Sequence, residues 1–384
     1  MKSALIMCNA DPAGDPRPNR MIHCLKDSFK VTVAARGKPN IDGVKTLILP
    51  ANKKMNLTEK MMFATNLKAR RFEHILWPEK MKKICQTLLR NSYDLIIIHD
   101  LYLLPLALSA KKNAKVLFDA REYYPRHYED QLYWRFFFQS FNKYLCSAYL
   151  HQCDRVITVS DGIAEEYYKN YGVNADVIMS LPFYHHYSPS QTNPRKINVI
   201  YHGNANPSRR TDLMIEIMDY LDHRFTLDLM LMPSDPPYLR KLTAKANKRQ
   251  NVKIIPPVSY NKIIPFTNNY DIGLFLFPPT TLNLKYGLGN KLFEFIQARL
   301  AVAVGPSIEW KKIVEKWDCG VVANDFKPKT LAKALNNLTA EKIIYYKQRS
   351  NQASQELNAE ANCQKIKAIV HKLTEAQNVL AVAN

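Results

Sequence analysis

The sequence predicts an α/β protein with two doubly wound, Rossmann-like domains. The chain has 384 residues, which is more than one hydrophobic core usually supports. Short runs of branched residues alternate with longer helix-like stretches, the pattern of parallel strands joined by crossover helices. These runs stop before a segment with three prolines, 181–196, and then begin again. Each half should therefore form its own parallel sheet.

The expected strands follow the apolar runs in order. In the first half they are 4–8, 30–34, 45–49, 95–99, 115–119, 155–160 and 176–180. In the second half they are 198–202, 226–231, 252–255, 272–277, 301–305 and 320–323. Past Pro328 the pattern is helical and polar to the end. We expect an amino-terminal domain over 1–188, a carboxy-terminal domain over 189–357 and a last helix over 358–384.

The charge of the chain is far from balanced. It has 54 basic and 34 acidic residues, a net charge of +20. Such a field favours anionic partners, which include nucleic acid, acidic lipid and phosphorylated substrates. No run approaches the roughly 18 apolar residues that span a membrane, and the first ten residues lack the pattern of a secretory leader. We therefore expect a cytoplasmic protein.

Motifs for metals and common cofactors are missing from the sequence. Its seven cysteines are scattered, without Cys-x-x-Cys or paired Cys/His spacing, so we expect buried thiols rather than disulfides or zinc ligands. There is no P-loop, and no glycine-rich dinucleotide fingerprint opens a domain. No two aspartates stand two residues apart, so a paired-carboxylate metal clamp is not expected either. The sequence thus favours metal-independent chemistry.

Two loops of the second half could hold a departing diphosphate, which needs cationic side chains and a helix N-terminus. Both follow strands at their carboxyl ends, where doubly wound sheets bind ligands. The candidate residues of the first loop are Gly203, Arg209 and Arg210. Those of the second loop are Lys285, Gly287, Gly289, Asn290 and Lys291. The glycines would admit a phosphate to the backbone, and Asn290 would cap the next helix. The alternative is a pair of capped surface loops with solvated charges.

Six short segments stand in a distinctive order and spacing. They are Asp11-Pro12 to Asp15-Pro16-Arg17 with Arg20, His99-Asp100-Leu101-Tyr102, Phe118-Asp119-Ala120-Arg121-Glu122, 154–161, Tyr201-His202-Gly203 and 290–295. Through them the sequence resembles family 4 glycosyltransferases over nearly its whole length. The resemblance implies the GT-B fold, in which two Rossmann-like domains face each other across a cleft and the last helix returns to the first domain.

The resemblance also implies roles in the donor site. Arg209 or Arg210 takes the place of the family's basic residue that grips the diphosphate. Glu294 matches the glutamate that hydrogen-bonds the donor ribose, and we expect it to be a partly exposed carboxylate in the first turn of its helix. A second family glutamate, near the donor sugar, is replaced here by Lys285 and Tyr286. The expected reaction is a hexosyl transfer with retention of configuration.

Four polar residues after strands of the first half are candidates for catalysis: Glu122, Arg121, His99 and Asp100. Relatives often have Asp-Ala-His-Glu where this chain has arginine at the third position. A guanidinium keeps its proton in proteins, so Arg121 could contact a phosphate or an acidic acceptor but could not act as a base. Any general base would be one of the other three. The alternative is that these residues cap helices or satisfy buried groups.

Basic and bulky apolar residues are interleaved in two stretches, 51–90 and 132–150. The first contains ten basic and three acidic residues. Such faces suit a layer of anionic lipid at the inner face of the cytoplasmic membrane. Loss of four lysines should then weaken binding to anionic vesicles: Lys53, Lys54, Lys60 and Lys68. The alternative is that the apolar faces pack on the sheet and the lysines are simply solvated.

We expect an enzyme that transfers a sugar from a nucleotide-diphosphate donor to a saccharide or lipid-linked acceptor in cell-surface polysaccharide synthesis. UDP is the first choice of nucleotide and GDP the second. The nucleotide sugar is a co-substrate, so no cofactor and no metal are expected. Two alternatives stay open, a catalytically inactive scaffold of this fold and a basic nucleic-acid-binding protein, although the sequence has no recognisable nucleic-acid module.

Overall fold

The computed structural model describes residues 1–50, 55–76 and 79–381. Its contacts divide the chain into two compact units. Unit 1 comprises Met1–Met179 and Asn362–Asn384, and unit 2 comprises Ser180–Ala361. The proline-bearing segment after Met179 belongs to unit 2, where the Thr192 hydroxyl donates a hydrogen bond of 2.8 Å to Asp271.

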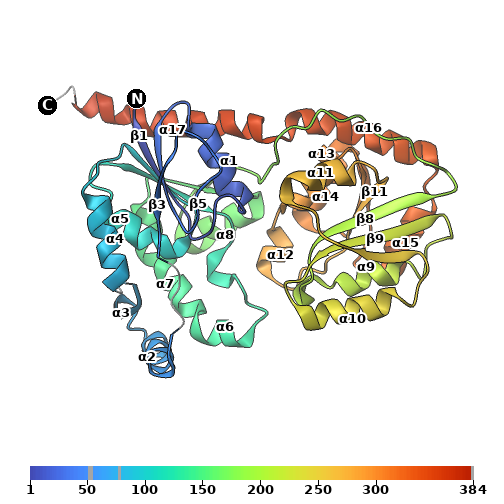
Figure 1. Ribbon diagram of the computed structural model, residues 1–384, viewed down its shortest axis with the longest axis horizontal. Helices are drawn as coiled ribbons and strands as arrows, with labels where there is room; N and C mark the ends of the chain where they lie inside the picture. The colour runs from blue at the N-terminus through green and yellow to red at the C-terminus, as the bar shows by residue number, and fades with distance from the viewer. Residues whose placement is uncertain (51–54, 77–78, 382–384) are drawn as a thin grey trace. The chain divides into compact units, whose positions relative to one another are not determined.

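Unit 1 is built on a seven-stranded parallel sheet in the order β3-β2-β1-β4-β5-β6-β7 (Figure 1). Its strands are β1 (Ser3–Met7), β2 (Lys30–Ala35), β3 (Lys45–Ile48), β4 (Leu95–Ile98), β5 (Lys115–Ala120), β6 (Arg155–Thr158) and β7 (Ala175–Val177). Its helices are α1 (Pro16–Leu25), α2 (Leu57–Lys68), α3 (Glu73–Leu76), α4 (Glu79–Leu89), α5 (Leu104–Ser109), α6 (Leu132–Phe137), α7 (Gln139–Tyr149), α8 (Asp161–Tyr171) and α17 (Ala359–Ala381). Every residue of β4 is apolar and buried, as expected for a central strand of a parallel sheet that is covered on both faces.

Unit 2 repeats this plan with a six-stranded parallel sheet in the order β10-β9-β8-β11-β12-β13. Its strands are β8 (Ile197–Asn204), β9 (Phe225–Met232), β10 (Val252–Ile255), β11 (Ile272–Phe275), β12 (Ala301–Val304) and β13 (Gly320–Val322). Its helices are α9 (Thr211–Ile217), α10 (Pro236–Ala246), α11 (Ile263–Thr267), α12 (Leu282–Tyr286), α13 (Asn290–Gln297), α14 (Ile308–Trp317), α15 (Pro328–Asn336) and α16 (Ala340–Glu356). The predicted α/β class is confirmed, and every expected strand overlaps an observed one.

The strand order of each sheet reverses at one point. In unit 1 the chain moves outward from β1 in one direction and from β4 in the other, and in unit 2 the corresponding pair is β8 and β11. A doubly wound sheet opens a crevice beyond the carboxyl ends of such strands, because the connecting loops there diverge. The residues that follow β1, β4, β8 and β11 are therefore placed to meet ligands.

The last helix completes the core of unit 1. Ile366 and Val370 of α17 pack into the apolar cluster formed by β1, β2 and α1, and the Lys2 ammonium donates a hydrogen bond to the Thr374 carbonyl. Cys24 and Cys363 form a disulfide with their Cα atoms 5.3 Å apart. The expectation that no cysteine is disulfide-bonded is therefore wrong. Sequence could not indicate this pair, because 339 positions separate its members and only the packing of α17 on α1 brings them together.

Candidate active site

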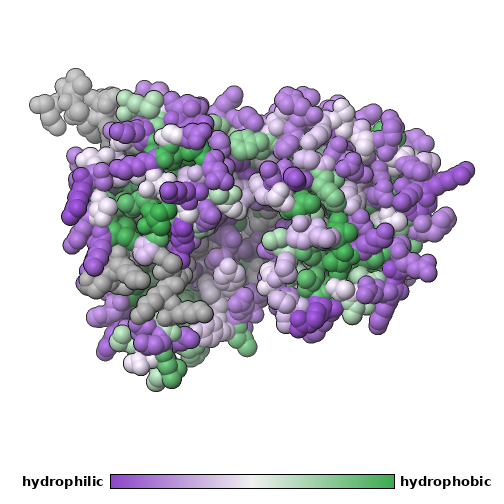
Figure 2. All heavy atoms as spheres, in the orientation of Figure 1, coloured by the Kyte–Doolittle hydropathy of each residue, from purple (hydrophilic) through white to green (hydrophobic). Residues whose placement is uncertain are grey.

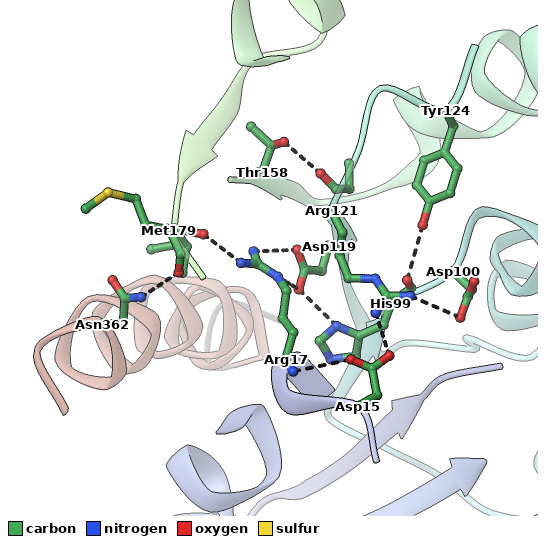
Figure 3. A network of polar contacts seen from close by, with 12 residues as sticks. Asp15, Arg17, His99, Asp100, Asp119, Arg121, Tyr124, Thr158, Met179 and Asn362 are labelled. Atoms are coloured by element: carbon green, nitrogen blue, oxygen red, sulfur yellow. Dashed lines mark hydrogen bonds and ion pairs between the residues drawn. The ribbon is translucent and has the colours of Figure 1, made fainter. Parts of the chain in front are cut away.

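Figure 3 shows a polar network at the carboxyl ends of β1, β4 and β5 in unit 1. Arg17, in the first turn of α1, donates two hydrogen bonds of 2.7 Å to the two oxygens of Asp119 at the end of β5. Its remaining terminal nitrogen donates to the Ile178 carbonyl at 2.8 Å. Both charged side chains are buried, so the pair is a fully desolvated, bidentate ion pair.

His99 lies against the same carboxylate. Its Nδ1 atom is 2.9 Å from Asp119 Oδ2, although the two are not aligned as a hydrogen bond, and its Nε2 atom is buried with no hydrogen-bond partner among the described residues. Burial opposes ionisation of Asp119, but the Arg17 charge and the His99 contact outweigh it and hold the pKa of Asp119 well below its usual range. Asp119 is therefore a permanent anion that orders its neighbours.

Arg121 joins the second part of the network. It contacts Asp15 at 2.6 Å, and its other terminal nitrogen is 3.9 Å from Asp100. Asp100 accepts a hydrogen bond of 2.8 Å from the Asn9 amide. Burial raises the pKa of Asp100, although Arg121 and the Asn9 amide oppose the rise. A carboxylate with a raised pKa is a better proton acceptor than an ordinary surface aspartate.

The structure brings three of the four catalytic candidates together. His99, Asp100 and Arg121 all belong to this network (Figure 3). Glu122 instead lies with its carboxylate 2.5 Å from His127, and its side chain is almost half exposed. Asp15, Arg17 and Asp119 complete the network, and no local sequence pattern marks these three residues as partners.

The first donor candidate of unit 2 stands at the end of β8. Gly203 has a φ of 151°, a conformation that residues with a side chain rarely adopt. A Cβ atom at this position would collide with the Lys291 side chain and would lie 2.8 Å from the Tyr201 hydroxyl. Glycine is thus required because the Lys291 stem, which comes from α13, crosses the backbone of β8 at this point.

Lys291 stands in an unfavourable place for a cation. Burial and the nearby charge of Arg209, opposed by Glu294, together lower the pKa of Lys291 to about 7. Burial raises the pKa of Tyr201, and the nearby charge of Arg209 opposes that rise. Two partly buried cationic side chains therefore repel each other here, where an anion would stabilise both.

Three buried polar atoms near this spot make no well-aligned hydrogen bond among the described residues, although Arg209 and Thr211 lie close enough to the Tyr201 hydroxyl to lower its pKa. They are the Tyr201 hydroxyl, the Thr211 hydroxyl and His202 Nε2. Tyr201 and His202 are consecutive residues of β8, and Thr211 begins α9. Buried polar groups are usually hydrogen-bonded, so unsatisfied ones mark a strained, hydrated or ligand-binding place. Two of the three are hydroxyls, which can donate to an anionic oxygen.

The two neighbouring arginines of this loop differ in their surroundings. Arg210 has a left-handed backbone with a φ of 45° and precedes α9. Its half-exposed guanidinium binds Asp212 at 3.0 Å, and Asp212 also accepts from the Tyr238 hydroxyl. Arg209, by contrast, acts on Tyr201 and Lys291. Of the two alternatives that the sequence left open, the geometry favours Arg209.

Glu294 is buried, with 4% of its surface exposed, so the expectation of a partly exposed carboxylate is wrong. Its Oε2 atom lies 3.5 Å from His202 Nε2. Burial, helped by Lys291, lowers the pKa of His202 to about 3, so this histidine is neutral. The surroundings of α13 explain the burial, because all six consecutive residues from Leu292 to Gln297 are buried and the helix is therefore covered on every side there.

The remaining candidates lie in the loop before α13. Asn290 is the first residue of the helix and Gly289 its N-cap, so the expectation that Asn290 caps it is wrong. Gly287 is needed for a local reason, since a Cβ there would collide with the Asn283 carbonyl, and its own carbonyl accepts from Trp310 at 3.1 Å. The Lys285 ammonium lies over the Tyr286 ring at 4.8 Å from its centre. Gly289 has open space around it.

Within the described part of the chain, no group of three His, Cys, Asp or Glu side chains is arranged to hold a metal ion. The described helices likewise include none with the length and apolar character needed to cross a bilayer.

Comparisons with known proteins agree with this geometry. A family model described as Glycosyltransferase Family 4 matches residues 22–182. No curated protein matches the sequence. HepE of Anabaena, solved with UDP and glucose, aligns with a TM-score of 0.71 and 12% identity over 97% of this chain and 100% of its own. Sucrose-phosphate synthase of Thermosynechococcus elongatus aligns with a TM-score of 0.74 and 13% identity over 98% and 100%.

A third solved structure is WaaG, a glycosyltransferase involved in lipopolysaccharide biosynthesis. It aligns with a TM-score of 0.63 and 12% identity, over 94% of this chain and 98% of its own. At these identities the solved structures establish the fold, and the family model adds the relationship of the amino-terminal half. The chain therefore has the GT-B fold, and within it residues 22–182 match the Glycosyltransferase Family 4 model.

Proposed function

We propose that the enzyme transfers a sugar from a nucleotide-diphosphate donor, UDP before GDP, to a saccharide or lipid-linked acceptor in cell-surface polysaccharide synthesis. Transfer would proceed with retention of configuration and without a metal. The observation that carries the proposal is the cationic place at the end of β8, where Lys291 and Arg209 lie near the buried hydroxyls of Tyr201 and Thr211, which make no well-aligned hydrogen bond. An anion with several acceptor oxygens would give the two cations ion pairs and the two hydroxyls hydrogen bonds.

A diphosphate fits this requirement in both charge and hydrogen-bonding capacity. Its oxygens would accept from the Tyr201 and Thr211 hydroxyls and would hold Lys291 in its charged form. When the bond to the sugar breaks, negative charge grows on the departing phosphate. Two cationic side chains already held at this place would stabilise that charge, which is the task a metal would otherwise perform. Glu294, buried on the same helix as Lys291, is the proposed partner of the donor ribose.

Unit 1 would supply the acceptor side of the reaction. Arg121 and Asp100 are the partly exposed members of the polar network. The ion pair of Arg17 and Asp119 is its buried part. Asp100 is the proposed proton acceptor, because its pKa is raised by burial. The solved structures support the choice of donor and pathway by their own ligands and roles: HepE binds UDP and glucose, and WaaG acts in lipopolysaccharide biosynthesis.

Two adjacent arginines provide a matched test of the donor site. Arg209→Gln should weaken binding of UDP about ten- to a hundredfold, because a charged hydrogen bond contributes roughly 1.5 to 3 kcal/mol. Arg210→Gln should change UDP binding less than about threefold, since its guanidinium is occupied by Asp212 at the surface. Calorimetric titration of both variants with UDP measures the difference, and hydrolysis of a panel of nucleotide sugars identifies the donor.

Equal losses in the two variants would place the diphosphate elsewhere on this loop. A protein that binds neither UDP nor GDP and hydrolyses no nucleotide sugar would contradict the proposal. Such a result would favour the inactive scaffold or the nucleic-acid binder.

A further inference from the structure

Six large apolar side chains of unit 1 point into solvent from two helices. On α2 they are Leu57, Met61 and Met62, and on α6 they are Leu132, Tyr133 and Phe136. Their exposed fractions run from 62% to 75%. Single exposed apolar residues are ordinary, but a contiguous group marks a place of interaction.

The two helices form one surface, which we name the α2–α6 face. The rings of Phe63 on α2 and Phe138, just after α6, lie 6.1 Å apart. The Lys68 ammonium of α2 lies 5.7 Å above the Phe136 ring. In Figure 2 apolar side chains gather at the lower end of unit 1, over the places where Figure 1 labels α2 and α6.

This face is held rigidly from beneath. Trp134 of α6 is buried, and Leu67 is the buried residue of α2. Behind them Phe72 contacts the ring of Phe141 at 5.3 Å. The exposed apolar side chains of the face therefore stand on two helices whose other sides are packed against unit 1.

Basic side chains outnumber acidic ones in the two segments that carry the face, although Glu129 and Asp130 stand just before the second segment. Residues 55–76 contain four basic and two acidic side chains, and residues 131–149 contain two basic and no acidic ones. The exposed cations of these stretches are Lys60, Lys68, Arg70, Arg71, Arg135 and Lys143. Long cationic side chains can lay their stems along apolar matter and keep their charge at a polar boundary. Exposed apolar side chains accompanied by exposed cations are complementary to a layer of acidic headgroups over acyl chains.

We propose that the α2–α6 face inserts its apolar side chains into the surface of an anionic lipid membrane. The exposed cations attract the headgroups. The boundary beneath the headgroups is entered by Leu57, Met61, Met62, Leu132 and Phe136. Tyr133 supplies an aromatic ring with a hydroxyl, a group that favours the water–lipid interface. A second protein would be expected to meet a surface with fewer cations, because charged residues are depleted in the centres of protein interfaces.

The test uses the full chain and vesicles of phosphatidylcholine, either pure or with about a quarter phosphatidylglycerol. Wild type should sediment with the anionic vesicles. A triple variant, Met61→Ser with Met62→Ser and Phe136→Ser, should lose more than about thirtyfold in partition, because each substitution removes a large apolar side chain from the lipid. Raising the salt to about 0.5 M should weaken wild-type binding without abolishing it.

A control carries Tyr168→Ser and Tyr220→Ser, which remove exposed tyrosines outside the α2–α6 face. It should bind vesicles as wild type does. Of the four lysines that the sequence predicts to matter, Lys60 and Lys68 are exposed on α2. Lys53 and Lys54 lie outside the described residues.

Three results would overturn the proposal. They are a triple variant that binds as well as wild type, a wild type that binds neither kind of vesicle, and a wild-type dimer that the triple variant dissolves without any binding to vesicles. The last would make this face a contact between two copies. Calorimetry with UDP on the same samples checks that the variant is folded. It also keeps the two proposals separate, since the vesicle assay needs no nucleotide and the donor assay needs no lipid.

Discussion

Lys291 should make nucleotide binding depend on pH. In the free protein burial and Arg209 lower the pKa of Lys291 to about 7, so above that pH the amine is mostly neutral. A bound diphosphate favours the ammonium and raises this pKa, and binding therefore takes up a proton. Between about pH 7.5 and pH 9 the affinity for UDP should fall by nearly tenfold per pH unit. Titrations in buffers with different heats of ionisation count the proton directly.

Lys291→Met provides the control for this dependence. It keeps the length of the stem across Gly203 and removes the titrating group. The variant should bind UDP weakly and almost equally across the same pH range. A slope that persists in Lys291→Met would assign the proton to another group.

At the scale of single elements, the Arg17–Asp119 pair fastens α1 to the end of β5. Asp119→Asn keeps the shape but leaves a buried guanidinium without its anion, which costs about 3 to 5 kcal/mol. Asp176→Asn is a matched control, since Asp176 pairs with Arg155 at the surface at 2.6 Å and should contribute about 0 to 1 kcal/mol. Urea unfolding of both variants gives the two free energies. Similar values would contradict the structural importance of the buried pair.

The pH dependence of this contribution has a definite sign. The pKa of Asp119 is lower in the folded protein than in the unfolded chain. Its stabilisation is therefore complete above the unfolded pKa, near about 4, and is lost as the pH falls. Wild type should lose more stability on acidification than Asp119→Asn does.

The elements themselves could be predicted from sequence more readily than their contacts. A run such as β4, with four apolar residues in succession, encodes its own burial, and so all expected strands found a counterpart. The Arg17–Asp119 pair joins residues 102 positions apart, and nothing local to either residue announces it. The same is true of Lys291, which is an ordinary helix lysine until α13 is packed against Gly203.

Local rules also failed where tertiary packing overrode them. Asn290 suits a helix cap, but the helix begins one residue earlier than that role requires, with Gly289 at the cap. Glu294 suits a solvated first turn, but α13 is covered on every side from Leu292 to Gln297. Sequence thus placed a loop and a helix correctly after β11 but misjudged the cap of that helix and the exposure of Glu294.

At the scale of the whole molecule, each unit has its own sheet and its own apolar core. Two such units should give two unfolding transitions in calorimetry, and different reagents should move them. The proposed site for UDP lies in unit 2, so UDP should stabilise that unit alone. At a concentration of about 100 times its dissociation constant it stabilises that unit by about 2.7 kcal/mol, which corresponds to a rise of about 5 to 10 °C.

A reducing agent should act on the other transition. The Cys24–Cys363 disulfide joins α1 to α17 within unit 1, so its reduction should lower the melting temperature of unit 1 and leave the response of unit 2 to UDP intact. Cys24→Ser should reproduce this shift without the reagent and should abolish any further effect of it. If UDP and reduction move the same transition, or if only one transition exists, then the two units unfold as a single cooperative body and their cores are not independent.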